Sequence, residues 1–199
     1  MYKNVIKPTL DFLIALQLML LFFPLLVLCS VAIKLDSQGP VFFFQERVGK
    51  DLKFLLVPKF RTMTNANREV GTKPIIGKSE GVTRVGFYLR RFKIDELPQL
   101  VNLLNGQMSL VGPRPNIPSH LDNMTDEEKK RYSVRPGLTG LAQVSGNIHI
   151  SWPERFKKDL EYVRNISLFN DLKIIMRTIH LIFVGEAYYA NKPMRFERD

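Results

Sequence analysis

The sequence predicts an α+β protein that is mostly helical, contains one small β-hairpin and begins with a membrane-anchoring helix. Three observations support this fold class. Residues 12–33 carry no charge, two short strand-like segments follow within thirty residues, and helical periodicity returns several times between residues 84 and 184. We therefore divide the chain into an N-terminal anchoring helix, residues 1–34, and a second domain, residues 35–199.

The apolar segment would form a helix roughly 33 Å long, about the thickness of a bilayer core. It has no polar face, which argues against a soluble core helix, and it is too long for a signal peptide and lacks a cleavage site. Pro24 lies near its middle and predicts a kink, and Lys or Arg residues flank both ends. A helix that bends at Pro24 and leaves by the face it entered satisfies both observations. A straight span also accommodates a proline, so the residues alone leave both topologies open.

Residues 40–47 (PVFFFQER) and 53–60 (KFLLVPKF) read as two strands joined by a turn at 48–52. Pro58 favours an edge position for the second strand. The following segment, residues 64–81, is polar and interrupted by Gly and Pro, which predicts a mobile loop.

Helices are expected over five segments: residues 84–93, 95–105, 125–132, 152–165 and 171–184. Gly106 provides the stop for the second, and Thr125 with Glu128 forms a capping box at the start of the third. Residues 112–118 (GPRPNIP) predict a rigid bend, and the glycine-rich residues 134–146 predict a loop.

The last of these helices is amphipathic. Its apolar side chains follow helical spacing, and its polar side chains include three basic or titratable ones, Lys173, Arg177 and His180. One interpretation is a helix whose apolar face packs on the core. The other is a helix lying in the membrane surface, where a basic face suits anionic headgroups.

The composition restricts the function. With 29 Lys and Arg against 19 Asp and Glu, the net charge is +10, which indicates anionic partners such as phosphorylated metabolites, acidic lipids or nucleic acid. A single cysteine, Cys29, excludes an internal disulfide and cysteine-rich zinc sites. No nucleic-acid-binding module is recognisable, so we expect no nucleic-acid partner.

The segment Asp95-Glu96-Leu97-Pro98-Gln99 opens a predicted helix. Free N–H groups and positive partial charge at a helix start keep a carboxylate ionised and suit a nearby phosphate or magnesium–phosphate complex. A simple N-cap role for Asp95 is the alternative. Several basic residues lie in or near Gly- or Pro-containing segments, where rigid turns can present a guanidinium fork to phosphate: Lys59, Arg61, Arg90, Arg114 and Arg135. Together with the carboxylate pair they indicate a phosphate-handling enzyme.

The chain resembles bacterial sugar transferases of the small monotopic phosphoglycosyl transferase type. The resemblance extends from the apolar segment to about Val184, and it depends on the order and spacing of six motifs: Pro40-Val41-Phe42-Phe43 through Gln45, Arg47 and Gly49; Lys59-Phe60-Arg61-Thr62-Met63; Thr83-Arg84-x-Gly86; Asp95-Glu96-Leu97-Pro98-Gln99-Leu100; Met108 to Pro115; and Arg135-Pro136-Gly137-x-Thr139-Gly140-x-Ala142-Gln143.

This resemblance implies that a UDP-sugar gives its sugar-1-phosphate to polyprenyl (undecaprenyl) phosphate, with UMP as the other product. It implies that Asp95 is the nucleophile of a covalent intermediate and a ligand of Mg²⁺, and that Glu96 assists at the metal or the acceptor. Phosphate and uridine binding is expected from Lys59, Arg61, Arg90, Arg114, Pro115 and Arg135.

The resemblance further implies a re-entrant helix broken at Pro24 and a catalytic domain, residues 35–199, on the cytoplasmic face of the bacterial inner membrane, with interfacial amphipathic helices in contact with lipid. Assembly of a surface glycan would begin with this product. A homodimer is compatible with the resemblance. The alternative from another functional class is a non-catalytic membrane scaffold of a glycan assembly system. The glycine common in the family's hairpin turn is missing from Lys50-Asp51-Leu52-Lys53.

Overall fold

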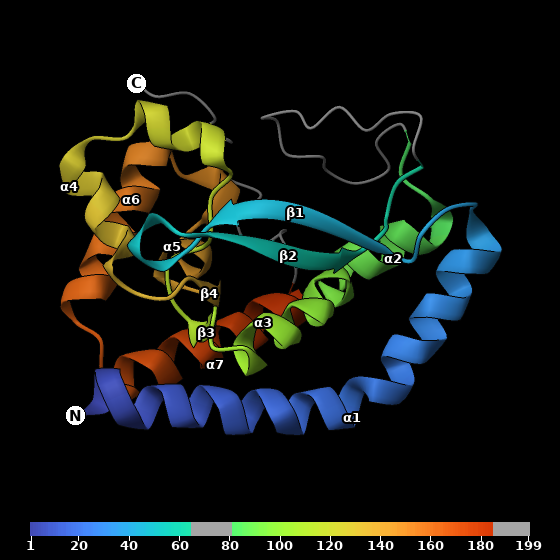
Figure 1. Cartoon of the computed structure of the whole chain (residues 1–199), viewed down its shortest axis with the longest axis horizontal. Coiled ribbons are helices and arrows are strands. Elements are labelled where there is room, and N and C mark those ends of the chain that lie inside the picture. Colours follow the sequence, from blue (N-terminus) through green and yellow to red (C-terminus); the bar gives the residue numbers. More distant parts are fainter. Residues whose placement is uncertain (65–80, 185–199) are drawn as a thin grey trace.

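The computed structural model describes residues 1–64 and 81–184 (Figure 1). The predicted mobile loop at 64–81 therefore lies outside the described residues except for its two ends, where the Thr64 N–H donates to the Gly81 carbonyl at 2.9 Å. The chain forms these helices and strands in order: α1 (Lys7–Asp36), β1 (Phe42–Val48), β2 (Phe54–Phe60), α2 (Arg84–Arg91), α3 (Leu100–Leu104), β3 (Ser109–Val111), α4 (Asp126–Lys129), β4 (Gly137–Thr139), α5 (Leu141–Val144), α6 (Trp152–Arg164) and α7 (Leu168–Val184).

Helix α1 is continuous and runs along one side of the molecule before it bends in its second half (Figure 1). Pro24 lies inside the helix, and the Ser30 hydroxyl donates to the Leu26 carbonyl at 2.7 Å, so two features that bend helices are present. The predicted kink is confirmed. The helix is long and apolar enough to cross a membrane, and much of its apolar surface is exposed. The boundary at residue 34 stays a prediction.

Two core clusters hold α1 against the rest of the chain. In its first half, Ala15 is fully buried among residues of the hairpin, α3 and the segment before β3: Leu55, Val57, Leu100, Leu103 and Met108. In its second half, Cys29 and Ile33 pack with Phe60 and Leu89. The bend therefore lets one helix contact two separate parts of the domain.

A buried polar network fixes the start of α1 to α7 and β3. The Lys7 ammonium lies 2.7 Å from Asp171 Oδ2, which also accepts from the Tyr2 hydroxyl at 2.6 Å. The Tyr162 hydroxyl lies 2.8 Å from Asp171 Oδ1, and burial together with the Asp171 charge raises the pKa of Tyr162. Asp11 accepts from the Ser109 hydroxyl at 2.6 Å and from the Leu110 N–H at 3.1 Å. Every carboxylate oxygen in this network has a donor.

The predicted hairpin is confirmed. Strands β1 and β2 pair antiparallel, with Arg47 opposite Leu55 and Phe43 opposite Lys59. Since residues two apart on a strand share a face, Arg47, Gln45 and Lys59 lie on the side that also carries the buried Leu55 and Val57. In the turn, Asp51 and Leu52 take positive φ values of 54° and 60°, conformations that glycine would adopt without strain.

One sequence expectation is confirmed in part and one is wrong. The segment predicted as one helix at 95–105 is helical, but it begins as a 3₁₀ turn, Ile94–Gln99, which contains Pro98, and only Leu100–Leu104 is α-helical. The segment predicted as a loop at 134–146 contains strand β4 and helix α5. Strand β4 pairs parallel with β3, a pairing between short segments that local periodicity does not reveal. The capping box of Thr125 and Glu128 is confirmed.

Helix α7 does not bury its apolar stripe. Five of the large apolar side chains on it are exposed: Leu172, Met176, Ile179, Ile182 and Phe183. The inward face instead carries Ile174 and Thr178, whose hydroxyl lies 2.6 Å from that of Thr139 on β4. The core-facing interpretation of that stripe is therefore wrong, and the exposed stripe agrees with the membrane-surface alternative.

Candidate active site

The Asp95–Glu96 pair is positioned by a tight change of direction after α2. Lys93 takes a left-handed conformation, with φ 58° and ψ 18°, and starts the 3₁₀ turn Ile94–Gln99. Pro98 and Gln99 are buried, and the turn packs against strand β2. The Glu96 carboxylate thereby reaches Lys59 on the hairpin, and the Asp95 carboxylate lies close enough for the Lys59 charge to act on it.

Both oxygens of Glu96 are engaged by cations. Oε1 lies 2.8 Å from the Lys59 ammonium and 2.5 Å from one guanidinium nitrogen of Arg114, and Oε2 accepts from the other nitrogen at 3.2 Å. Burial raises the pKa of Glu96, but Arg114 and Lys59 outweigh burial and hold that pKa well below its ordinary value. Glu96 is thus ionised at neutral pH and holds two cations in place.

Asp95 is in the opposite condition. Its Oδ1 is buried without a hydrogen-bond partner among the described residues. Burial and the adjacent Glu96 charge raise the pKa of Asp95, while Lys59, Lys93 and Arg90 act in the other direction. A half-buried carboxylate with an oxygen lacking a donor is suited to bond with an electrophile or a cation, and it costs stability until it does so.

Two further arginines extend this cationic region, and the site prediction missed both. Arg47 donates to the Pro115 carbonyl at 3.1 Å and to Gln45 Oε1 at 2.5 Å, and burial and Arg114 lower the pKa of Arg47 to about 10. The signal for Arg47 was present in the sequence, because Gln45 and Arg47 share a strand face. Pro115, predicted to bind substrate, contributes its carbonyl to holding Arg47.

Arg155 is the second missed residue. Its Nε donates to the Ile150 carbonyl at 3.0 Å, and its guanidinium stacks 4.4 Å from the centre of the Trp152 ring. Burial, followed by the neighbouring charge of Arg114, lowers the pKa of Arg155. No local motif marks it, since it lies on α6, some forty residues after Arg114.

The predicted basic residues divide into three groups. Lys59, Arg90 and Arg114 surround the carboxylate pair, as their effects on the pKa values of Asp95 and Glu96 require. Arg61 is buried elsewhere and donates to the carbonyls of Ile33, Ser37 and Gln38, where it caps the end of α1. The substrate-binding role predicted for Arg61 gains no support from this placement. Arg135 lines a separate pocket.

Comparison with known proteins supplies the family. A model of the family described as "Bacterial sugar transferase" matches residues 2–185. The chain is 39% identical over 174 residues to an uncharacterized sugar transferase, EpsL, of Bacillus subtilis, covering 87% of this chain and 85% of that protein.

Two relatives have names that state a reaction. The UDP-glucose:undecaprenyl-phosphate glucose-1-phosphate transferase of Caulobacter vibrioides is 41% identical over 192 residues, covering 92% of this chain and 72% of the relative. The UDP-N-acetylgalactosamine-undecaprenyl-phosphate N-acetylgalactosaminephosphotransferase of Aeromonas hydrophila is 39% identical over 186 residues, and the match spans 44% of its length. From the match over nearly its whole length, the chain belongs to the bacterial sugar transferase family, whose named relatives here are phosphoglycosyl transferases.

Proposed function

We propose that this protein transfers a sugar-1-phosphate from a UDP-sugar to undecaprenyl phosphate and releases UMP. The observation that carries the proposal is the contrast inside the pair: Glu96 is saturated by Lys59 and Arg114, whereas the neighbouring Asp95 keeps an oxygen without a donor. The names of the relatives from Caulobacter vibrioides and Aeromonas hydrophila support the reaction and differ in the sugar, so the sugar stays unassigned.

In the first step, the Asp95 carboxylate attacks the phosphorus that carries the sugar. A new O–P bond forms, the bond from that phosphorus to the bridging oxygen breaks, and the bridging oxygen leaves with its electron pair on UMP. The product on the protein is an aspartyl phosphosugar. In the second step, an oxygen of undecaprenyl phosphate attacks the same phosphorus, and the Asp95 carboxylate is regenerated.

The cations have distinct tasks in this scheme. Arg114 is held by Glu96 and still 40% exposed at its side chain, so it can contact the donor diphosphate. Arg47 and Arg155 are oriented by backbone carbonyls and extend the positive region beside it. Arg47 and Arg114, together with Arg90 near Asp95, stabilise the charge that develops on the leaving UMP, whereas Arg155 at the edge of the region helps to bind the donor. Glu96 acts as a positioning residue for Lys59 and Arg114.

The site suits Mg²⁺, which takes hard oxygen ligands and is commonly held by one or two carboxylates together with substrate phosphates. In the described part of the chain, no cluster of three or more His, Cys, Asp or Glu side chains could hold a metal on its own. Asp95, with its unpartnered buried oxygen, would hold the ion with the donor diphosphate. When bound, Mg²⁺ would neutralise diphosphate charge and orient UMP for departure.

We further propose that α1 enters and leaves the inner membrane by its cytoplasmic face. The bend of α1, its exposed apolar surface and the exposed stripe of α7 support attachment to one leaflet. The domain would then start a surface glycan on the cytoplasmic side, where both substrates are available to it.

A UMP-release assay tests the proposal. The purified protein receives undecaprenyl phosphate, Mg²⁺ and one UDP-sugar at a time from a set that includes UDP-glucose, UDP-galactose and UDP-N-acetylgalactosamine. We expect UMP with at least one sugar, and none with Asp95→Asn. Labelled UMP should exchange into the UDP-sugar without the lipid, because the first step is complete in itself. Absence of UMP with every donor would contradict the proposal and favour the scaffold alternative.

A further inference from the structure

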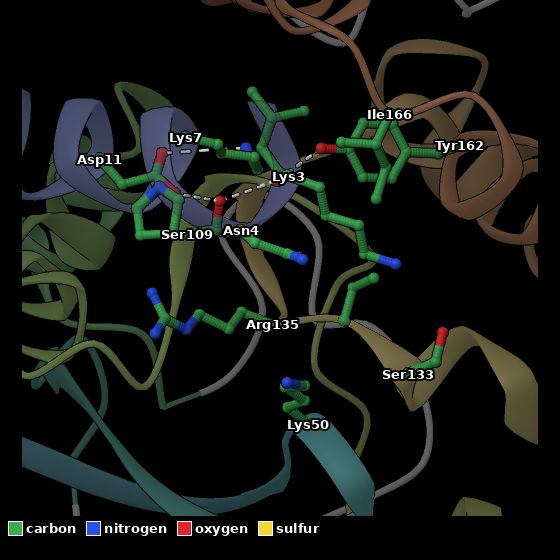
Figure 2. Close-up of a pocket in the computed structure, with 13 residues that line it drawn as sticks. Lys3, Asn4, Lys7, Asp11, Lys50, Ser109, Ser133, Arg135, Tyr162 and Ile166 are labelled. Atoms are coloured by element: carbon green, nitrogen blue, oxygen red, sulfur yellow. Dashed lines mark hydrogen bonds and ion pairs between the residues drawn. The ribbon is translucent and has the colours of Figure 1, made fainter. Parts of the chain in front are cut away.

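A basic pocket that does not include Asp95 lies between the start of α1, the hairpin turn and the segment before β4. Its volume is about 290 Å³, and four basic side chains line it: Lys3, Lys7, Lys50 and Arg135. Figure 2 shows Lys50 entering from the hairpin side and Arg135 lying between it and the first residues of α1. One carboxylate, Asp11, is part of the lining, so the lining carries a formal charge of 4 − 1 = +3.

Asp11, the carboxylate in this lining, is already engaged. Asp11 accepts from Ser109 and from the Leu110 N–H, and Lys7 is bound to Asp171 outside the lining. The positive charge of the pocket therefore comes from Lys3, Lys50 and Arg135. Lys50 lies 3.8 Å from Asp51, but both side chains are about half exposed, so this pair contributes little. Within residues 1–64 and 81–184, Lys3 and Arg135 make no ion pair.

Arg135 is held in place by the β3–β4 pairing. The residue that follows, Pro136, accepts a hydrogen bond from the Ser109 N–H at 2.8 Å, and the Gly137 N–H donates to Pro113 at 2.9 Å. The guanidinium lies over Gly106, where a Cβ would be 3.7 Å from one of its nitrogens. A half-buried guanidinium with a fixed backbone and no anionic partner among the described residues is a pre-organised binding group for a phosphate.

This pocket is separate from the site of Asp95. The cations that shift the pKa values of Asp95 and Glu96 are Lys59, Arg90, Lys93 and Arg114, none of which lines the pocket. Its location also differs, because its lining includes Lys3 and Asn4, some eight residues before the uncharged stretch that starts at residue 12. If α1 enters a membrane, these residues lie at headgroup depth.

We propose that this pocket binds a phosphate group, and that its source is the headgroup of an anionic membrane phospholipid. The lipid source rests on the membrane attachment in the proposed function. Apolar side chains beside the basic ones, Pro8, Val134 and Ile166, suit the glycerol and upper acyl region of such a lipid. The bound phosphate would hold the start of α1, the hairpin turn and the β4 segment together at the membrane surface.

The test uses the full chain in a neutral detergent. Binding of dioctanoyl phosphatidylglycerol and of inorganic phosphate is measured by native mass spectrometry and by calorimetry. Compared variants are Lys50→Gln, Arg135→Gln and the double variant Lys3→Gln/Lys50→Gln. Lys158→Gln serves as the control, since the Lys158 side chain on α6 is 40% exposed, pairs with Glu161 and does not line the pocket. Asp95→Asn separates this site from the reaction.

We expect one phosphatidylglycerol per chain, about tenfold weaker binding for each single pocket variant, and unchanged binding for Lys158→Gln and Asp95→Asn. Because Lys50 is exposed, its substitution leaves folding intact and keeps the test valid even if Arg135→Gln unfolds. Phosphate binding that depends on Arg135 while the lipid does not bind would overturn the lipid source. Undiminished binding of both ligands by all pocket variants would overturn the site itself. Neither result depends on turnover, so failure of the proposed reaction would be seen separately.

Discussion

Two clusters of buried carboxylates can be compared in this molecule. At the start of α1, Asp11 and Asp171 have a donor on every oxygen, and the cluster joins the apolar helix to α7 and β3. At the 3₁₀ turn, Glu96 is saturated in the same way, but Asp95 retains a buried oxygen with no donor in the described chain.

The difference teaches how to separate a structural carboxylate from a reactive one. Burial is common to both clusters, and both contain lysine partners. A saturated carboxylate has little to gain from a ligand, whereas an unsaturated one lowers the stability of the fold until a ligand or a covalent bond completes it. In the proposed function Asp95 does the chemistry, whereas Asp171, Asp11 and Glu96 hold their partners in position. Asp159 also has a buried oxygen without a described partner, but its other oxygen is bound by Arg131.

The largest expected effect follows from Asp95→Asn. Turnover should fall by at least about 10³-fold, because the nucleophile is removed. Stability should stay equal or rise. Because the folded state raises the pKa of Asp95, an ionised Asp95 lowers the free energy of unfolding at neutral pH. The neutral amide of Asn removes this cost. UMP release and thermal unfolding measure the two effects. A loss of stability together with retained turnover would break the comparison.

Glu96→Gln should damage both properties. It leaves Lys59 and Arg114 without their counter-charge, which we expect to cost about 2–4 kcal/mol of folding free energy, given that Arg114 is partly exposed. The contribution of Glu96 is present above the ordinary pKa of a glutamate and is lost as pH falls through its depressed folded pKa. Denaturant unfolding at pH 7 measures the loss. An unchanged unfolding midpoint would contradict the positioning role.

Asp171→Asn should destabilise the fold by about 2–4 kcal/mol, since it leaves the buried Lys7 ammonium without its close partner. Turnover per folded molecule should change less than about threefold, because the cluster does not touch the reacting atoms. Parallel measurement of unfolding and UMP release checks both parts. A collapse of turnover in a fully folded variant would show that the two clusters are not separate.

The pH dependence gives a smaller effect. Attack requires the ionised form of Asp95, so turnover should fall with decreasing pH at a value above the ordinary aspartate pKa of about 3.9. Glu96→Gln removes the like charge that helps to raise this pKa, so the acid limb should move to lower pH in the residual activity. If the acid limb of the pH–rate profile stays at the same pH in Glu96→Gln, the group that titrates there is not Asp95.

Arg155→Gln should produce the smallest change. Arg155 lies at the edge of the cationic region and is oriented by Ile150 and Trp152, so we expect KM for the UDP-sugar to rise about tenfold with kcat nearly unchanged. Initial rates over a range of donor concentrations measure this. Arg155→Lys should bring KM part of the way back to its original value. A tenfold fall in kcat with an unchanged KM would contradict a binding role.

Much of the fold follows from local sequence. The apolar run, the kink at Pro24, the hairpin and the capping box at Thr125 each depend on neighbouring residues, and each is found in the structure. The pairing of β3 with β4 joins segments of three residues each, some thirty residues apart, and could not be read from periodicity. The spacing of α7 identified an apolar stripe but not whether protein covers it.

The site was predictable to a similar degree. The Asp95–Glu96 pair and the Gly- or Pro-framed Arg114 are visible as motifs, and the structure brings them together with Lys59 and Arg90. In the sequence, Arg61 looks as suited to phosphate binding as Arg114 does, yet in the structure it caps the end of α1. The tertiary fold, not the local motif, decides which partners an arginine finds. Arg155 carries no local signal and reaches the region only through the placement of α6.

The central claim is that the carboxylate of Asp95 becomes bonded to phosphorus. We would mix the protein with UDP-sugar labelled in the phosphate next to the sugar, quench within milliseconds, digest, and locate the label by mass spectrometry. The account predicts an acid-stable, hydroxylamine-sensitive label on the peptide that contains Asp95, and none in Asp95→Asn. A label on another residue, or no label in a preparation that releases UMP, would contradict it.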